Sequence, residues 1–164
     1  MQSETPPIYE AHFIHLMDSL YCFVYPLPVE TVRDTRAMRL RVLIVDDSET
    51  IRRMLGTILR SRRWTVCGEA EDGQSGVQKF HQLKPDVVLL DLSMPDITGI
   101  EAAKLMSAID PTAPLILFTI LEIEGIENAA REAGIRAIVP KIEAWNLIGG
   151  IESLVAQKSR PQTQ

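Results

Sequence analysis

The sequence has no excess of positive charge. Its 17 lysines and arginines face 22 aspartates and glutamates, giving a formal net charge of -5 over 164 residues. Because binding to a phosphate backbone requires a basic surface, this balance argues against direct nucleic-acid binding. Cysteine is scarce too: Cys22 and Cys67 lack metal-ligand spacing, which predicts reduced thiols in a cytoplasmic protein.

Long apolar runs are also missing. The apolar stretch 20–29 contains Pro26 and Pro28, so it is too short and too broken to cross a bilayer. The first residues lack the positive charge of a signal peptide. We therefore expect no membrane segment, and we expect residues 1–39 to be a poorly structured N-terminal extension. Two interpretations of it stay open: a docking or anchoring segment, or an upstream stretch without a role, with Met38 as the natural start.

From Leu40 onward, short apolar runs alternate with segments of helical periodicity. Runs rich in Val, Ile and Leu predict buried strands at 42–45, 87–90, 115–118 and 138–139. Helices are expected after Ser48, over 73–83, from about Gly99, over 123–133 and over 143–157. Five strands alternating with five helices predict an α/β fold with a doubly wound parallel sheet over residues 40–157, followed by a tail at 158–164.

Three smaller features complete the structural prediction. Thr98 and Glu101 form a capping box, which predicts the start of the third helix. Trp64 and Trp145 are interpreted as packing residues. The histidines belong to no catalytic pattern.

Polar side chains follow each of the four apolar runs. Asp46 and Asp47 follow the first run, Asp91 the second, Thr119 the third and Lys141 the fourth. If these runs are parallel strands, all five side chains emerge at the carboxyl edge of one sheet, where open α/β sheets bind ligands. Three carboxylates, one hydroxyl and one ammonium predict a site for a divalent cation and a phosphoryl group.

Each of these residues also has an ordinary structural explanation. Asp46, Asp47 and Ser48 can be helix-capping residues at a strand-to-helix turn. Thr119 can be a strand-end residue and Lys141 a solvated charge. Independent accidents would not all fall on one edge of the sheet, so the joint pattern favours a functional site.

Four motifs occur together and in order: Val45-Asp46-Asp47-Ser48, the box from Asp91 to Gly99 with Met94-Pro95, Phe118-Thr119, and Val139-Pro140-Lys141. Together they resemble the receiver domains of bacterial two-component response regulators. The resemblance covers residues 40–157, and the stretch 133–144 looks most like receivers of LuxR-type regulators. It implies a flavodoxin-like receiver fold with strand order 2-1-3-4-5.

The resemblance also implies a chemistry and a set of partners. Asp91 would accept a phosphoryl group from a sensor histidine kinase or a histidine phosphotransfer protein. Mg²⁺ would be held by Asp46, Asp47, Asp91 and the backbone carbonyl of Ser93, while Lys141 and Thr119 would contact the phosphoryl oxygens. Such a protein is not an enzyme, although it assists its own phosphorylation and dephosphorylation. It would signal through an unknown protein target, and the formation of a homodimer is left as an open alternative.

Three isoleucines depart from the family pattern. Ile138 stands where an aromatic residue normally rotates, Ile142 replaces a common proline, and Ile120 replaces a small residue. The main alternative is a pseudo-receiver that binds proteins without being phosphorylated, but such a protein is expected to lack some of Asp47, Asp91 and Lys141, and all are present. A flavodoxin-like cofactor binder is disfavoured because the acidic pair would repel a bare phosphate. An aspartyl phosphohydrolase is disfavoured because Ser93 stands where that class has a second aspartate.

Overall fold

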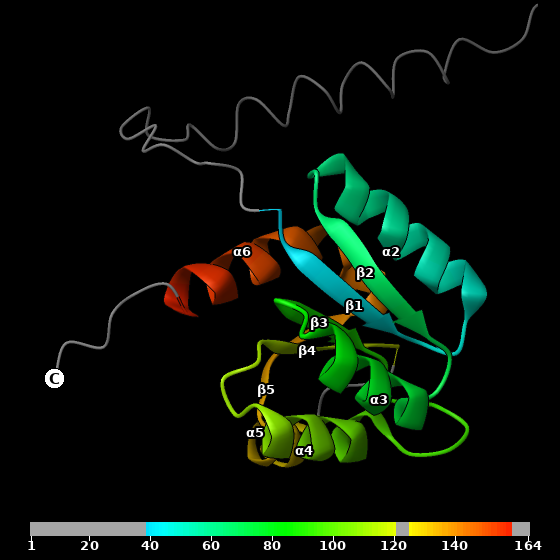
Figure 1. Ribbon diagram of the computed structural model, residues 1–164, viewed down its shortest axis with the longest axis vertical. Coiled ribbons are helices and arrows are strands. Elements are labelled where there is room, and N and C mark those ends of the chain that lie inside the picture. Colours follow the sequence, from blue (N-terminus) through cyan, green and yellow to red (C-terminus); the bar gives the residue numbers. More distant parts are fainter. Residues whose placement is uncertain (1–38, 121–124, 159–164) are drawn as a thin grey trace, which may run out of the picture. The chain divides into compact units, whose positions relative to one another are not determined.

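Strands and helices alternate along the part of the chain that the structure describes. This structure is a computed structural model, and it describes residues 39–120 and 125–158. The elements, shown in Figure 1, are β1 (Arg41–Val45), α2 (Glu49–Ser61), β2 (Thr65–Ala70), α3 (Gly73–Leu83), β3 (Val87–Leu90), α4 (Gly99–Ile109), β4 (Leu115–Thr119), α5 (Glu127–Glu132), β5 (Ile135–Pro140), the 3-10 helix η1 (Lys141–Asn146) and α6 (Leu147–Lys158). The predicted extension, up to residue 38, and the tail beyond residue 158 lie outside the described residues.

The five strands form one parallel sheet in the order β2-β1-β3-β4-β5. This confirms the predicted fold class and strand order. β1 and β3 lie side by side in the sheet, with Val45 opposite Leu90. Since the chain leaves β1 for β2 on one side and leaves β3 for β4 on the other, the strand order reverses between β1 and β3. A crevice therefore opens outside the carboxyl ends of these two strands.

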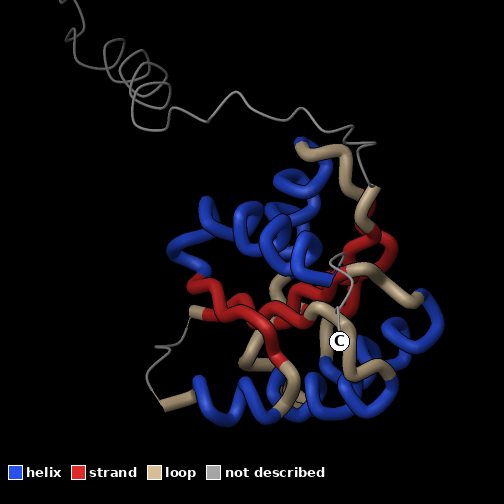
Figure 2. Tube along the Cα trace, turned by 90° about the vertical axis from the view of Figure 1, so that its left-hand side faces the viewer, coloured by secondary structure: helices blue, strands red, loops and turns tan. Residues whose placement is uncertain are grey.

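Helices cover both faces of the sheet, as the two blue layers around the red strands show in Figure 2. Alternate residues of a strand point to opposite faces, so a strand with helices on both sides is apolar throughout. In β1, Leu43 and Val45 belong to a core that includes residues of α3, α4 and α5. Val42 and Ile44 belong to a second core with residues of α2 and α6. The continuous apolar runs in the sequence follow from this double burial.

Two helices begin where the capping residues predict. The Ser48 side chain accepts a hydrogen bond from the backbone N–H of Ile51 at the start of α2. At the start of α4, the Thr98 hydroxyl accepts from the Glu101 N–H, and the Glu101 carboxylate accepts from the Thr98 N–H at 2.8 Å. The capping box is confirmed, and it fixes the end of the loop that leaves β3.

The last predicted helix is wrong at its beginning. In place of one helix over 143–157, η1 runs from Lys141 to Asn146 and α6 begins at Leu147. Within η1, Glu143 has φ -108° and ψ 35°, which is not helical, so the chain is kinked inside this segment. The expected helix over 123–133 is observed as the shorter α5; residues 125–126 form a turn, and the predicted first residues, 123 and 124, lie outside the described residues. Gly134, at φ 86°, follows α5 as expected.

The two tryptophans differ in burial. Trp64 is buried in the core between the sheet and the layer of α2 and α6, as predicted for a packing residue. Trp145 is 71% exposed, so its interpretation as a packing residue is wrong. It lies in η1, whose Glu143 departs from helical geometry.

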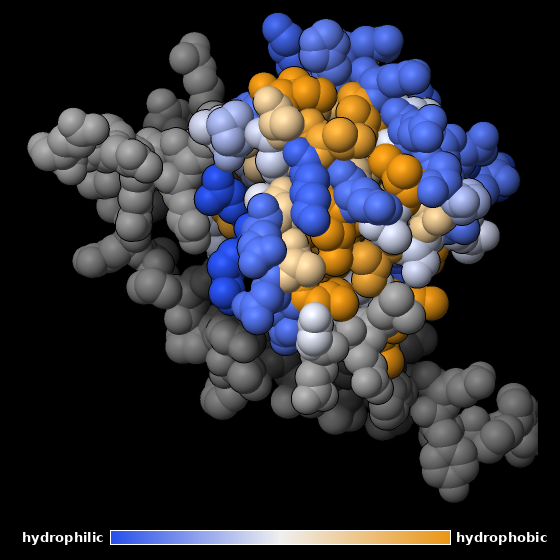
Figure 3. All heavy atoms as spheres, turned by 90° about the horizontal axis from the view of Figure 1, so that it is seen from below, coloured by the Kyte–Doolittle hydropathy of each residue, from blue (hydrophilic) through white to orange (hydrophobic). Residues whose placement is uncertain are grey.

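The outer face of the α3, α4 and α5 layer keeps apolar side chains at the surface, as Figure 3 shows from this side. On α4, Leu105 and Ile109 are large hydrophobic residues that stay exposed. They are four residues apart and therefore share one face of the helix.

Among the described helices, none combines the length and the apolar character that a bilayer crossing requires.

Candidate functional site

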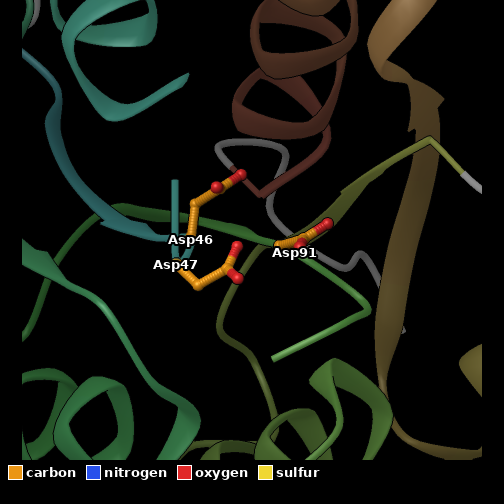
Figure 4. A group of neighbouring side chains, drawn as sticks. All are labelled: Asp46, Asp47 and Asp91. Carbon is orange, nitrogen blue, oxygen red and sulfur yellow. The ribbon is translucent and has the colours of Figure 1, made fainter. Parts of the chain in front are cut away.

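The three predicted acidic residues meet at the carboxyl ends of β1 and β3, as Figure 4 shows. One carboxylate oxygen from each of Asp46, Asp47 and Asp91 lies within 4.8 Å of the others. Asp46 and Asp91 are buried, whereas Asp47 is exposed. The parallel sheet therefore places the acidic groups of the first and third predicted strands in one cluster.

Backbone hydrogen bonds fix the ends of these strands. The Asp46 N–H donates to the carbonyl of Ala70 at 3.0 Å, and the Asp91 N–H donates to the carbonyl of Val45 at 2.8 Å. The Asp46 carboxylate also accepts the N–H of Ser48 at 2.9 Å. The ordinary capping interpretation is thus right for Ser48 and partly right for Asp46, but it does not account for the buried Asp91.

Lys141, the first residue of η1 directly after β5, joins the cluster. Its Nζ lies 2.7 Å from Oδ2 of Asp46 and 3.0 Å from Oδ1 of Asp91. The lysine side chain is only 10% exposed, and its two partners are 1% and 5% exposed. Nζ also lies 6.0 Å from the centre of the Phe118 ring. The interpretation of Lys141 as a solvated surface charge is therefore wrong.

Burial and ion pairing act on the pKa values of this group. Burial raises the pKa of Asp91, and the contacts with Lys141 oppose this rise without cancelling it. The negative charge of Asp46 acts in the same direction as burial. Burial alone would lower the pKa of Lys141, yet that pKa is raised, because the contacts with Asp46 and Asp91 together outweigh desolvation. The ammonium stays charged and is held by both carboxylates.

Thr119 and Ser93 occupy the positions that the sequence predicts. Thr119 is buried at the end of β4, opposite Pro140 of β5, the residue before Lys141. Ser93 is exposed in the loop between β3 and α4. The roles of the Thr119 hydroxyl and the Ser93 carbonyl remain predictions.

Sequence reasoning missed the contacts that hold the loop after β3. The Asp96 carboxylate accepts the N–H groups of Gly73 at 2.9 Å and Gln74 at 2.8 Å, at the start of α3. Desolvation would raise the pKa of Asp96, but the N–H donors of Gln74 and Gly73 outweigh this effect and lower the pKa. Gly99 N–H donates to the carbonyl of Leu92 at 2.9 Å and closes the loop. The sequence does not indicate which groups the Asp96 carboxylate contacts.

Sequence reasoning also missed Arg52 on α2. Its guanidinium donates to the backbone carbonyls of Asp46 at 2.7 Å and Asp47 at 3.1 Å. The same guanidinium lies 3.4 Å from the carboxylate of Glu69 on β2. An arginine in the first turns of the helix after the acidic pair is the one signal that points to this contact.

The acidic cluster fits a hard divalent cation. Mg²⁺ prefers oxygen ligands at about 2.0–2.1 Å in octahedral geometry and usually keeps several waters. Carboxylate oxygens of Asp46, Asp47 and Asp91 are close enough to share one ion of this size. Lys141 contacts one oxygen of Asp46 and one of Asp91; Asp91 has a second oxygen to offer, whereas the second oxygen of Asp46 also accepts the Ser48 N–H. Fold and site together define a doubly wound α/β protein with an acidic cluster and a buried lysine at its switch point.

Comparison with known proteins identifies the family. The family model of the response regulator receiver domain matches residues 42–148, so the chain belongs to this family. A chemotaxis protein CheY of Thermotoga maritima is 38% identical over 115 residues, covering 66% of this chain and 96% of that protein.

Solved structures of a LuxR-family response regulator and of a chemotaxis receiver are similar to this one. A LuxR-family response regulator from Aurantimonas superposes with a TM-score of 0.69 at 28% identity, covering 72% of this chain and 86% of the other. The CheX-CheY-BeF3-Mg complex from Borrelia burgdorferi gives a TM-score of 0.66 at 27% identity, covering 70% of this chain and 88% of the other. Because chemotaxis receivers match as well as a LuxR-type receiver, the predicted closeness to the LuxR type is one likeness among several.

Proposed function

We propose that Asp91 accepts a phosphoryl group from the phosphohistidine of a sensor histidine kinase or a histidine phosphotransfer protein, in a Mg²⁺-dependent phosphorelay. The observation that carries this proposal is the position of Lys141, whose Nζ contacts both Asp46 and Asp91 in the crevice beside Asp47. Membership in the receiver family and the CheY relatives support it.

The proposed step is the transfer of a phosphoryl group between two proteins. An oxygen of Asp91 attacks phosphorus, a new O–P bond forms, and the P–N bond to the donor histidine breaks, with its electron pair returning to the imidazole nitrogen. Bound Mg²⁺ would neutralise negative charge between the carboxylate and the phosphoryl oxygens. Lys141 would bind a phosphoryl oxygen through its ammonium, and Thr119 would donate its hydroxyl to another.

The acidic residues have separate roles in this proposal. Asp46, Asp47 and Asp91, with the backbone carbonyl of Ser93, would hold the metal through oxygen atoms. Burial of Asp91 in a crevice that already contains a positive charge supports the role of that residue as acceptor. Attack of water on phosphorus would later break the O–P bond and restore the carboxylate. The protein would thus assist its own phosphorylation and dephosphorylation without turning over a separate substrate.

Output is proposed to pass through contact with a downstream protein rather than with nucleic acid. The net charge of -5 supports this choice. Cytoplasmic localisation remains a prediction from the sequence.

A direct test is the Mg²⁺-dependent transfer of labelled phosphate from candidate kinases to the full chain. Wild type is expected to become labelled in Mg²⁺ and to stay unlabelled with a chelator. Asp91→Asn is expected to remain unlabelled. Asp86→Asn is the matched control, because Asp86 is an exposed aspartate that contacts the start of β1 and lies at the other end of the sheet. Equal labelling of wild type and Asp91→Asn would overturn the proposal.

The pseudo-receiver is the second candidate, favoured by the isoleucines near the crevice. Ile138 is partly buried against the core with α3, α4 and α5, where the family has a rotating aromatic residue. A β-branched aliphatic side chain has restricted rotamers and cannot reproduce that rotation. Wild type that binds a kinase or phosphotransfer protein but takes up no label from it would support this alternative.

A further inference from the structure

Arg52 connects three segments around the acidic cluster. It belongs to α2, it donates to two consecutive carbonyls of the loop after β1, and it pairs with Glu69 of β2. Its side chain is 13% exposed, whereas its neighbour Arg53 is 77% exposed and pairs only with Glu49 on the same helix. Burial strengthens the contacts of Arg52, since charge-assisted hydrogen bonds gain strength where water is excluded.

The carboxylates that meet at the cluster are held in different ways. The Asp46 carboxylate contacts Lys141 and accepts the N–H of Ser48. The Asp91 carboxylate contacts Lys141 as well. Within residues 39–120 and 125–158, no hydrogen bond or ion pair is found on the carboxylate of Asp47. The position of this exposed carboxylate is therefore set by its backbone.

Arg52 is the group that holds that backbone. It binds the Asp47 carbonyl directly and the Asp46 carbonyl one residue earlier, so it restrains both peptide groups around Asp47. The guanidinium fork is rigid and planar, and Glu69 orients it from the other side. The positive charge also partly offsets the repulsion among clustered carboxylates.

We propose that Arg52 is a positioning residue that holds the Asp47 carboxylate ready for the divalent cation. This inference rests on the metal site of the proposed function. Arg52 would touch neither the metal nor the phosphoryl group, and its effect would appear in metal affinity. Groups that orient metal ligands typically change metal affinity by about 10–100-fold when they are removed.

The test is a calorimetric titration of Mg²⁺ into the full chain without any phosphodonor. Arg52→Ala is expected to raise the Mg²⁺ Kd by about 10-fold. Arg52→Lys keeps the charge but lacks the Nε that faces Glu69 and the planar guanidinium, so its Kd is expected between those of wild type and Arg52→Ala. Arg53→Ala is the matched control and is expected to leave Kd unchanged. Unfolding in chelator shows whether each variant is folded.

The outcomes separate this inference from the proposed function. If Arg52→Ala binds Mg²⁺ as tightly as Arg53→Ala, the positioning role is overturned and phosphorylation of Asp91 is unaffected. If Arg52→Ala does not fold, the Mg²⁺ Kd of Arg52→Lys is the test instead. A Kd for Arg52→Lys equal to that of wild type then overturns the positioning role. If wild type and variants differ in Kd as expected but no donor labels wild type, the positioning role stands and the phosphoacceptor role fails.

Discussion

The α carbon of Gly99 lies directly against the carbonyl group of Asp91. A β carbon at position 99 would come within 2.1 Å of that carbonyl oxygen and 3.0 Å of the α carbon of Leu92. The first residue of α4 is therefore packed onto the backbone of the proposed phosphoacceptor. This close approach gives the glycine of the Asp91–Gly99 motif a physical reason, because every other residue carries a β carbon.

Gly99→Ala is expected to destabilise the protein. Helix propensity alone would favour alanine by about 1 kcal/mol. Overpacking against backbone atoms that cannot move aside typically costs about 1–3 kcal/mol. We expect the free energy of unfolding in urea to fall by about 2 kcal/mol. Gly149→Ala is the control, because Gly149 lies exposed in α6 with nothing within 4 Å of an added β carbon. It should stabilise by about 0.5–1 kcal/mol, and a shift of the same sign in both variants would contradict the steric argument.

Lys141→Met is expected to destabilise the metal-free protein at neutral pH. It would leave the buried carboxylates of Asp46 and Asp91 without their shared cation. Breaking a buried ion pair by removing one partner costs about 3–5 kcal/mol, and we expect a loss near the lower end in chemical unfolding. Lys104→Met, at an exposed lysine on α4, should change stability by less than about 0.5 kcal/mol. Comparable losses in the two variants would show that the contacts of Lys141 contribute little.

The loss of unfolding free energy in Lys141→Met should become smaller as the pH falls. Burial raises the pKa of Asp91 above 3.8, and loss of Lys141 removes a contact that lowers it. The cost of the unpaired carboxylate is complete above the folded-state pKa and disappears below 3.8, where the group is protonated in both states. Urea unfolding of both proteins at several pH values measures this difference. A deficit that grows toward acid would mean that Asp91 is not the group responsible.

The difference in stability between Asp96→Asn and wild type should disappear at low pH. The folded-state pKa of Asp96 is lowered: desolvation opposes the N–H donors of Gln74 and Gly73, but these prevail. The stabilisation by the carboxylate is therefore present above 3.8 and is lost as pH falls through the lowered value. We expect wild type to have the higher urea midpoint at neutral pH and the two midpoints to converge at low pH. A constant gap at all pH values would exclude the carboxylate charge as the cause.

Ile120→Ala is expected to speed labelling by a small phosphodonor such as acetyl phosphate. Ile120 follows Thr119 at the carboxyl edge, is 77% exposed and stands where the family has a small residue. We expect its bulk to narrow access to Asp91, so the wild-type rate should be slow. Ile142→Ala is the control, since Ile142 is 80% exposed and follows Lys141. Equal rates in wild type and Ile120→Ala would refute the steric role.

The sheet and the acidic cluster were predictable because each depends on local pattern and one topological rule. The run Val87–Leu90 is apolar throughout because helices cover both faces of its strand. Once the strands are parallel, the residues that follow them share one edge, so Asp47 and Asp91 had to approach each other. The family resemblance added the strand order and the role of Lys141, which periodicity alone could not supply.

Contacts between side chains and distant backbone were not predictable in this way. Arg52 reaches two carbonyls only because α2 packs in one particular rotation against β1 and β2. Asp96 meets the start of α3 only because two loops lie side by side. The break at Glu143 likewise has no local signal, since the residues around it are compatible with a helix.

A single ammonium shared by two carboxylates also offers a way to pass information across the crevice. If Asp91 acquired a phosphoryl group, the added negative charge would compete with Asp46 for Lys141. Asp46 would then lose that partner while its other contacts remain, and the contacts of the loop before α2 would change. Such a change of partner needs no rotating ring, so it remains open to a protein with Ile138 in that position.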